Sequence, residues 1–359
     1  MGILDIITKK NYEKRIFEGL TKAYDKTHEQ RLDLDKQPLV FVSDLHKGTR
    51  DGADDFRICE NAYRTCLDYY YKEGFRLLVV GDVEELWEDW PGKVIEKYKA
   101  TLELEAKFHD DNRYERLWGN HDDLWNDPKQ VAKHLHQFYP GLTVHEAMKF
   151  RVRSGDRDLG ILFVVHGHQG TADSDSKSKI PRLFVRYVWR NIQRITKRSL
   201  NTPAKDYDLR LRHNRAMFEW AKGHEDPVVM VAGHTHKPVF WKRPAQAADF
   251  ELTRPELALS EAEKQRPGAP ADPFTVPCYF NTGCCAFSDG DVTAIEIRDG
   301  KVRLVRWLDD EGRPQPQVLT NEEDLGDVFD QVAKKRTPPV VAAPGGGRPT
   351  VEERAPIEH

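Results

Sequence analysis

The chain has 359 residues, of which 39% are hydrophobic and 32% charged, and its formal net charge is −4. This length and apolar content are enough for one large domain, alone or with appendages. The slightly acidic balance excludes a generally basic surface, which is the whole-chain signature of nucleic-acid binding.

The first residues, MGILDIITKKNYEKR, join a short apolar start to charged side chains and lack the long apolar core of a signal peptide. No uninterrupted apolar run reaches the roughly 18 residues of a membrane span. The five cysteines are an odd number without CxxC spacing, which indicates reduced thiols in a reducing compartment. We therefore expect a cytoplasmic protein.

Helical and strand patterns alternate along the first part of the chain. Residues 5–34 are rich in Lys, Glu and Leu and predict a helix, within an N-terminal helical extension over residues 1–35. The apolar run PLVFVSD, which ends at Asp44, fits a buried strand. Residues 54–73 and 91–110 predict further helices. Alternating strands and helices indicate an α/β fold.

Five apolar runs share one feature, because each is followed by polar residues that can bind a metal ion. The polar ends are Asp44-Leu45-His46, Asp82, Asn120-His121-Asp122, His166-Gly167-His168 and His234-Thr235-His236. In open α/β sheets, ligands bind beyond the carboxyl ends of the strands. We therefore expect these residues to meet in one site.

The C-terminal part of the chain has strand patterns of another kind. CYFNTG, DVTAIEI and KVRLVRW alternate or run apolar, with turn signals at Asp289-Gly290 and Asp299-Gly300. They predict an antiparallel edge of the core.

Two further segments differ from the core in composition. Residues 243–274 contain several Pro and Ala and predict a loop insertion within a catalytic domain over residues 36–312. Residues 313–359 are rich in Pro, Gly and charge and predict a flexible tail.

The polar strand ends favour a centre with two metal ions. Imidazole and carboxylate are ligands that borderline-hard divalent cations prefer, and residues two apart on a strand point to one face. Asp44 and Asp82 supply two negative charges against four positive charges of two divalent ions. The remaining charge of about +2 suits a hydroxide and an anionic phosphate.

The ordered series DLH, GD, GNHD, HGH and GHTH resembles the calcineurin-like metallophosphoesterase superfamily, over roughly residues 38–308. The resemblance implies an α/β fold in which two mixed β-sheets pack face to face and are flanked by helices, in four layers (αββα). It also implies a hydrolase in which a metal-bridging hydroxide attacks a phosphate ester or pyrophosphate bond of a small anionic substrate.

The resemblance further assigns roles to single residues. The implied first-metal ligands are Asp44, His46 and His236, the second-metal ligands are Asn120, His166 and His234, and Asp82 bridges both ions. His121 would stabilise the transition state or protonate the leaving oxygen, and Asp122 would orient His121. We expect Mn²⁺, with Zn²⁺ and Fe as alternatives. His121 as a metal ligand is a second interpretation.

Within the superfamily, GDVEELWED, HGHQGTADSDS and RLFVRYVWRNIQR resemble the UDP-2,3-diacylglucosamine hydrolases, which cleave a pyrophosphate. Their HGD aspartate is replaced here by His168, and the chain is longer than theirs. Both departures put that substrate in doubt. For His168 itself a supporting, a substrate-binding and a structural role stay open.

Arginines recur every four residues from Arg182 through Arg186 to Arg198. On a helix they form a basic ribbon beside an apolar face, within a helical lid over about 180–200. Arg182 and Arg186 are candidate substrate contacts, and the 182–198 helix is a candidate for peripheral contact with anionic lipid at the inner membrane surface. An ordinary amphipathic helix with a solvated basic face is the alternative.

Other functions stay open at this stage. A nucleotide or cyclic-nucleotide phosphodiesterase and a general phosphomonoesterase use the same kind of site. A nuclease gains some support from the arginine ribbon, but the acidic balance weighs against nucleic acid. A metal-free scaffold ranks last, because all seven expected ligand positions are filled.

Overall fold

Two mixed β-sheets form the centre of the protein in the computed structural model, which describes residues 3–171, 207–240, 276–308, 312–318 and 322–334. The first has six strands in the order β1-β6-β7-β8-β10-β9, and the second has the order β13-β12-β11-β2-β3-β4-β5, with β14 paired to β12. Both contain parallel and antiparallel pairs.

The strands of the six-stranded sheet are β1 (Glu29–Asp33), β6 (Ala147–Ser154), β7 (Arg157–Val165), β8 (Val228–Ala232), β10 (Tyr279–Thr282) and β9 (Pro238–Val239). Those of the second sheet are β2 (Leu39–Val42), β3 (Arg76–Val80), β4 (Tyr114–Leu117), β5 (Val144–His145), β11 (Val292–Arg298), β12 (Lys301–Leu308), β13 (Gln315–Val318) and β14 (Glu323–Asp324).

Strand β2 explains why the sheets have helices on their outer side. All four of its residues are buried, and successive side chains point to opposite faces. Leu39 and Phe41 lie in the core that also contains the apolar residues of β7 and β8, so the two sheets pack face to face. Val40 and Val42 lie in a second core with the helix α2. A strand that is buried on both faces needs a covering layer on each.

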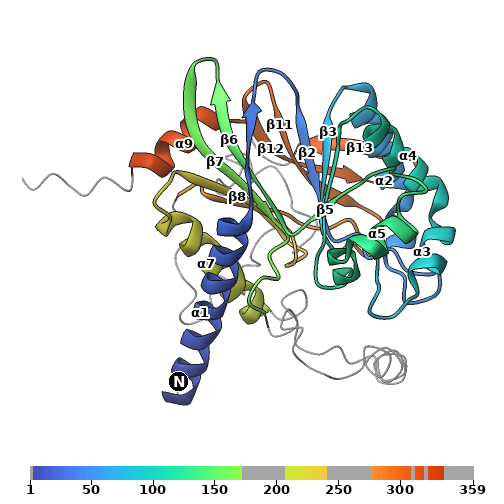
Figure 1. Cartoon of the computed structure of the whole chain (residues 1–359), viewed down its shortest axis with the longest axis horizontal. Helices are drawn as coiled ribbons and strands as arrows, with labels where there is room; N and C mark the ends of the chain where they lie inside the picture. Colours follow the sequence, from blue (N-terminus) through green and yellow to red (C-terminus); the bar gives the residue numbers. More distant parts are fainter. Residues whose placement is uncertain (1–2, 172–206, 241–275, 309–311, 319–321, 335–359) are drawn as a thin grey trace, which may run out of the picture.

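The helices supply those layers, on opposite sides of the paired sheets (Figure 1). The second sheet is covered by α2 (Phe56–Lys72), α3 (Pro91–Lys97), α4 (Lys99–Asp110) and α5 (Pro128–His134), with the short 3₁₀ helix η1 (Asp123–Asn126). The six-stranded sheet is covered by α1 (Ile3–Lys26), α7 (Tyr207–Gly223) and α9 (Leu325–Lys334). The predicted α/β fold with two mixed sheets and flanking helices is confirmed.

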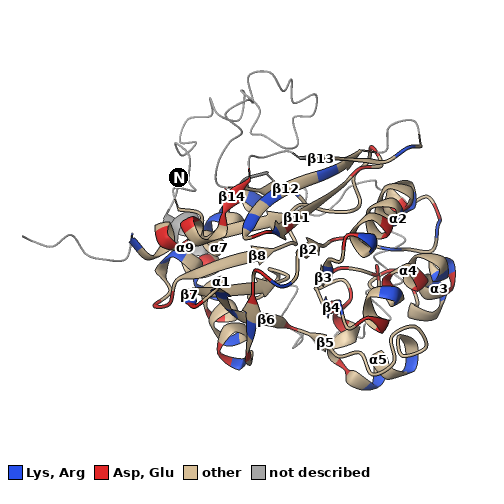
Figure 2. Ribbon diagram, turned by 90° about the horizontal axis from the view of Figure 1, so that it is seen from above, with Lys and Arg blue, Asp and Glu red and all other residues tan. Residues whose placement is uncertain are grey.

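Charged side chains of both signs are interspersed on the outer helices (Figure 2). None of the helices in the described part of the chain is both long and apolar enough to span a bilayer.

The helix predicted over residues 5–34 is wrong at its C-terminal end. It ends at Lys26, and Glu29–Asp33 form β1, parallel to β6. Pairing with a sheet edge, the burial of Leu32 and an ion pair between Arg151 and Glu29 at 3.0 Å outweigh the helical propensity of this segment. The wider division into domains stays a prediction.

Two predictions near the C-terminal end also need correction. Strand β10 is not part of an antiparallel edge, because it lies inside the six-stranded sheet, parallel to β8, whereas β11 and β12 do form the predicted hairpin. The tail predicted from residue 313 contains β13, β14 and α9, because Leu325, Val328 and Phe329 bury an apolar face on the core. The rest of that tail and the 243–274 insertion lie outside the described residues.

Candidate metal centre

The carboxyl ends of five strands bring the predicted metal ligands together. Asp44, Asp82 and Asn120 follow β2, β3 and β4 of one sheet, and His166 and His234 follow β7 and β8 of the other, with His46 and His236 two residues beyond Asp44 and His234. Because both sheets end at this edge, residues far apart in the sequence line one site.

One group of donor atoms contains Asp44, His46 and His236. Their ligand atoms all lie within 4.8 Å of one another. His236 Nε2 lies 3.2 Å from Asp44 Oδ1 and 3.1 Å from His46 Nε2. A carboxylate oxygen and two imidazole nitrogens at this spacing form a cradle that one divalent cation would fit.

A second group contains Asp82, His166 and His234, again with ligand atoms within 4.8 Å of one another. His166 Nδ1 lies 2.8 Å from the carbonyl oxygen of Val80, which only accepts hydrogen bonds, so the proton is on Nδ1. His166 Nε2 therefore points into the site, 3.1 Å from Asp82 Oδ2, and offers a lone pair to a cation once its own proton has left.

Three buried atoms of the site lack hydrogen-bond partners among the described residues. They are His166 Nε2, His234 Nε2 and Asn120 Oδ1, one from each residue predicted to hold the second metal. A buried polar atom without a partner is costly, so such atoms mark places where a ligand or ion completes the structure. The residues thus fit the metal ions that the sequence predicts.

The backbone of the site is held in an uncommon conformation. Left-handed φ angles occur at Asp44 (54°), His46 (51°), Asp82 (52°), His234 (71°) and His236 (57°). Such conformations cost of order 1–3 kcal/mol each and are concentrated at functional sites, although Asp and His tolerate them better than most residues. Hydrogen bonds between the loops hold them, because Asp44 Oδ2 accepts from His234 N at 2.9 Å and Asp82 Oδ1 accepts from His121 N at 2.8 Å.

Glycines in the motifs make room for carboxylates from neighbouring strands. A Cβ atom at Gly119 would overlap the carboxylate of Asp82, and one at Gly233 would collide with Asp44 and Ser43. The Gly-Asn and Gly-His pairs are therefore steric requirements of the site.

His121 lies beside these groups, and its partner is Glu85. Glu85 Oε2 lies 2.7 Å from His121 Nδ1 and 3.2 Å from His46 Nδ1, so one carboxylate oxygen contacts both imidazoles. The indole of Trp87 stacks on His121 with ring centroids 4.1 Å apart. Glu85 is not among the residues predicted from the sequence, although it is a carboxylate three residues after a candidate bridging aspartate, which is a usable signal.

The prediction that Asp122 orients His121 is wrong. The Asp122 carboxylate is buried under the loops and accepts hydrogen bonds from the backbone N–H groups of Gly119 at 2.6 Å and Val83 at 2.9 Å. Its role is to join the loop after β3 to the loop after β4. The Asp122 oxygens are occupied by these backbone amides, whereas His121 Nδ1 contacts Glu85.

The charges of the site are strongly coupled. Burial opposes ionisation of Asp82, but the nearby histidines, His166 first, hold its pKa well below the usual range. Burial likewise opposes protonation of His121, but Glu85 and Asp82 outweigh it and raise its pKa to about 10. The site therefore has the negative potential that a cation needs.

The candidate substrate contacts are only partly described. His168 is buried, its Nδ1 has no hydrogen-bond partner among the described residues, and its ring centroid lies 4.9 Å from that of Trp118. Burial and the neighbouring His166 lower the pKa of His168 to about 3, so it is neutral. Arg182, Arg186 and the rest of the predicted 182–198 basic helix lie outside the described residues.

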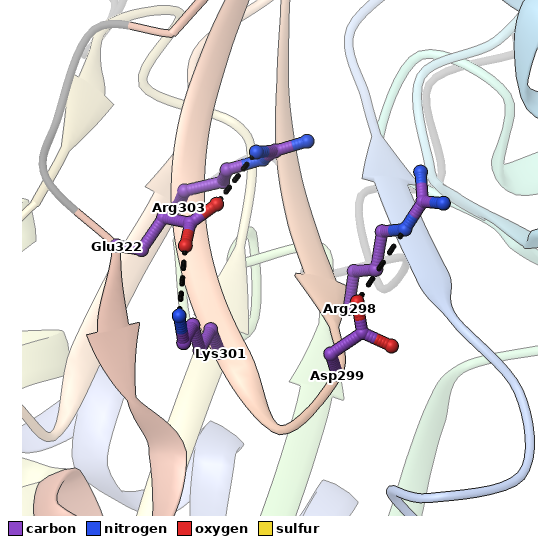
Figure 3. Close-up of a pocket in the computed structure, with 5 residues that line it drawn as sticks. All are labelled: Arg298, Asp299, Lys301, Arg303 and Glu322. Carbon is purple, nitrogen blue, oxygen red and sulfur yellow. Dashed lines mark hydrogen bonds and ion pairs between the residues drawn. The ribbon is translucent and has the colours of Figure 1, made fainter.

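A surface pocket at the opposite end of the second sheet is unrelated to this site. It lies at the β11–β12 turn, and its lining includes Arg298, Lys301, Arg303 and Glu322 (Figure 3). Ile297 pairs with Leu39 at the start of β2, whereas Asp44 follows the other end of that strand. Glu322 lies 3.2 Å from Lys301 Nζ and 2.8 Å from Arg303 Nη1, so ion pairs within the protein line this pocket.

Comparisons with known proteins give only distant similarity. No family model and no curated protein matches the chain. Among solved structures, a conserved uncharacterised protein of Streptococcus pneumoniae, described as a predicted phosphoesterase, is 14% identical over 79% of this chain and 97% of its own, with a TM-score of 0.29.

Two further solved structures are vacuolar protein sorting 29 from Cryptosporidium parvum and a single mutant of Vps29 from Entamoeba histolytica. Each is 13% identical and covers 80% of this chain, with 98% and 99% of their own chains aligned and TM-scores of 0.35 and 0.32. At these TM-scores the similarity assigns no function to the chain, so the site has to be interpreted from its own geometry.

Proposed function

We propose that this protein is a phosphoesterase that depends on two divalent metal ions. One observation supports it above the others: two groups of candidate metal ligands meet around Asp82, and three buried ligand atoms there have no hydrogen-bond partner among the described residues. Asp82 Oδ2 lies 3.1 Å from His166 Nε2 in one group and 3.8 Å from His46 Nε2 in the other. A carboxylate in this position is suited to bridge two ions.

We propose Mn²⁺ as the metal, with Zn²⁺ and Fe as alternatives. The donor set combines carboxylate, imidazole and amide oxygen, which borderline-hard cations accept, and it contains no thiolate. Two divalent ions supply a water activated for attack and positive charge that neutralises the phosphoryl oxygens. The surplus positive charge favours an anionic substrate.

His121 is suited to exchange a proton with the leaving oxygen. Glu85 holds Nδ1 at 2.7 Å, which leaves Nε2 as the nitrogen that can face a substrate. The stacked Trp87 ring fixes the imidazole plane. An acid with one nitrogen anchored and the other free is the usual arrangement for general acid catalysis.

The substrate that we propose is a small anion with a phosphate ester or pyrophosphate bond, with a nucleotide-sugar-lipid pyrophosphate as the form suggested by the motifs around Asp82 and His166. A monoester, a nucleotide diester and a cyclic nucleotide use the same attack on phosphorus. We propose a cytoplasmic location, with the basic helix that the sequence predicts over residues 182–198 as the candidate contact with anionic lipid.

A hydrolysis panel with added Mn²⁺ tests the proposal. It contains an aryl phosphate, an aryl phosphodiester, nucleoside diphosphate sugars, cyclic nucleotides and single-stranded DNA, each assayed with wild type and with Asp82→Ala. We expect wild type to hydrolyse at least one phosphate compound and to lose that activity with a chelator and in Asp82→Ala. Equal activity of wild type and Asp82→Ala, or no hydrolysis of any member by the metal-loaded protein, would overturn the assignment.

A further inference from the structure

Helix α7 places two adjacent residues beneath the two His-x-His loops. His213 and Asn214 are 1% and 6% exposed, and neither belongs to the candidate ligand set. Figure 1 shows α7 beside α1 on the outer face of the six-stranded sheet, and α7 packs against β8 and β10. Polar side chains buried this deeply need a structural or functional reason.

His213 contacts the loop that contains His166 and His168. Its Nε2 lies 2.8 Å from the carbonyl oxygen of Gly167, the residue between those two histidines. Since a carbonyl only accepts, Nε2 carries the proton and donates it. On the other side of the ring, Tyr12 OH lies 2.9 Å from Nδ1.

Asn214 contacts the loop that contains His234 and His236. Its Oδ1 accepts a hydrogen bond at 3.1 Å from the hydroxyl of Thr235, the residue between those two histidines. It also accepts at 2.8 Å from the hydroxyl of Tyr279 on β10. Each residue of the pair thus holds the middle residue of one loop.

We propose that His213 and Asn214 are positioning residues that set the distance between the two histidine loops of the metal centre. Two neighbouring residues on one helix have a fixed separation. The two loops that they contact are therefore held at a fixed distance from each other even without a metal ion. Mutation of groups that orient metal ligands typically costs roughly 10- to 100-fold in metal affinity. This inference rests on the proposed function, in which the loops bind metal.

Helix α1 takes part in the same arrangement. Tyr12 on α1 anchors His213, and α1 packs closely on the loop after β7, where a Cβ at Gly170 would overlap the backbone of Arg15. The segment that reads as an extension in the sequence is therefore part of what supports the site.

The first test compares two substitutions that differ in which nitrogen they imitate. His213→Gln places an amide N–H near the position of Nε2 and keeps a donor for Gly167, whereas His213→Asn is too short to reach it. Mn²⁺ binding to the metal-free protein is measured by calorimetry. We expect His213→Asn to lower the affinity for one of the two Mn²⁺ ions by roughly 10- to 100-fold. The affinities of His213→Gln should stay within a few-fold of wild type.

The second test uses Asn214→Leu, which keeps the volume but removes the acceptor for Thr235. We expect both ions to bind more weakly, because the loop held by Thr235 carries a candidate ligand of each. Thr21→Val is the matched control, since it breaks a hydrogen bond of 2.9 Å between α1 and Trp220 of α7 that touches neither loop. It should bind both ions as wild type does.

The outcomes separate this inference from the proposed function. A folded wild type that binds no Mn²⁺ contradicts the proposed function. A wild type that binds two ions, with His213→Asn and Asn214→Leu folded and binding as wild type, overturns the positioning role alone. If His213→Asn fails to fold, Tyr12→Phe replaces it, because it removes only the half-buried hydroxyl that contacts His213 Nδ1. If Asn214→Leu fails to fold, Thr235→Val replaces it, because it removes the hydroxyl that donates to Asn214 Oδ1. A several-fold weakening of one ion supports the role, and unchanged binding overturns it.

Discussion

Two buried polar clusters begin one residue apart in the chain, at His46 and at Lys47, and they are built in opposite ways. Lys47 Nζ lies 2.6 Å from Glu105 Oε1, and both side chains are fully buried. Three tyrosines complete the second cluster, because Tyr63, Tyr114 and Tyr139 donate to the Glu105 carboxylate at 3.1, 3.0 and 3.0 Å.

The cluster around Glu105 is closed, whereas the cluster around Asp82 is open. Charge and hydrogen bonds around Glu105 are matched within the protein. Burial alone would raise the pKa of Glu105, but the charge of Lys47 holds that pKa below its usual range. Around Asp82, imidazole nitrogens and an amide oxygen have no hydrogen-bond partner within the part of the chain that the structure describes. Burial of charge alone therefore does not mark a functional site, whereas buried acceptors that converge without donors do.

The largest effect is expected from Asp82→Ala, which removes a carboxylate that belongs to one donor group and lies 3.8 Å from His46 Nε2 of the other. We expect metal content to fall and hydrolysis to be lost, because the second group keeps only two histidines and no carboxylate links it to the first. Metal analysis of the purified variant and the hydrolysis panel check this. A variant with wild-type activity and no bound metal would contradict the account.

Lys47→Met probes the closed cluster and should affect stability alone. The substitution leaves Glu105 buried without its charge partner, which typically costs about 3–5 kcal/mol of unfolding free energy. Urea unfolding measures this loss, and the folded variant should still bind metal as wild type does. A variant that was as stable as wild type, or one that lost its metal while folded, would contradict the distinction between the two clusters.

His121→Ala should separate metal binding from turnover. We expect both ions to be retained and turnover to fall roughly 100-fold or more, as is usual when a general acid is removed. Metal content and turnover measured on the same sample of His121→Ala check this prediction. Loss of an ion in this variant would instead make His121 a ligand, which the proximity of His46, Asp82 and His121 permits.

Glu85→Gln should have the smallest effect of the series. The amide removes the negative charge that faces His121 and His46 and weakens their orientation, for an expected loss of roughly 10-fold in activity. Asp122→Asn is the comparison that tests the corrected assignment, because Asp122 serves loop amides. If Asp122→Asn altered the pH profile of turnover and Glu85→Gln did not, the assignment of Glu85 would fail.

Much of the fold could be predicted because strands and motifs are local in the sequence. The runs that end at Asp44, Asp82 and His166 are strands buried on both faces, and such strands read as continuous apolar segments. The structures of residues 29–33, 315–318 and 323–334 were missed, since they depend on a sheet edge and an apolar surface supplied by distant segments.

The candidate metal ligands could be predicted from the sequence, but the residues that hold them in place could not. Side chains at strand ends follow from the α/β pattern, whereas hydrogen-bond partners depend on loop paths that spacing does not determine. Asp122 lies next to His121 in sequence yet serves the amides of Gly119 and Val83, while Glu85 arrives from another strand. His213 and Asn214 lie on a helix that carries no motif at all.

The number of Mn²⁺ ions bound per folded chain tests the central claim most directly. Titration of the metal-free protein, with native mass spectrometry as the count, should give two ions for wild type. A free Mn²⁺ concentration of about 100 times the dissociation constant of one site should raise the free energy of unfolding by about 2.7 kcal/mol for that site. A folded wild type that binds no ion and gains no stability from Mn²⁺ would contradict the claim that the open cluster is a metal centre.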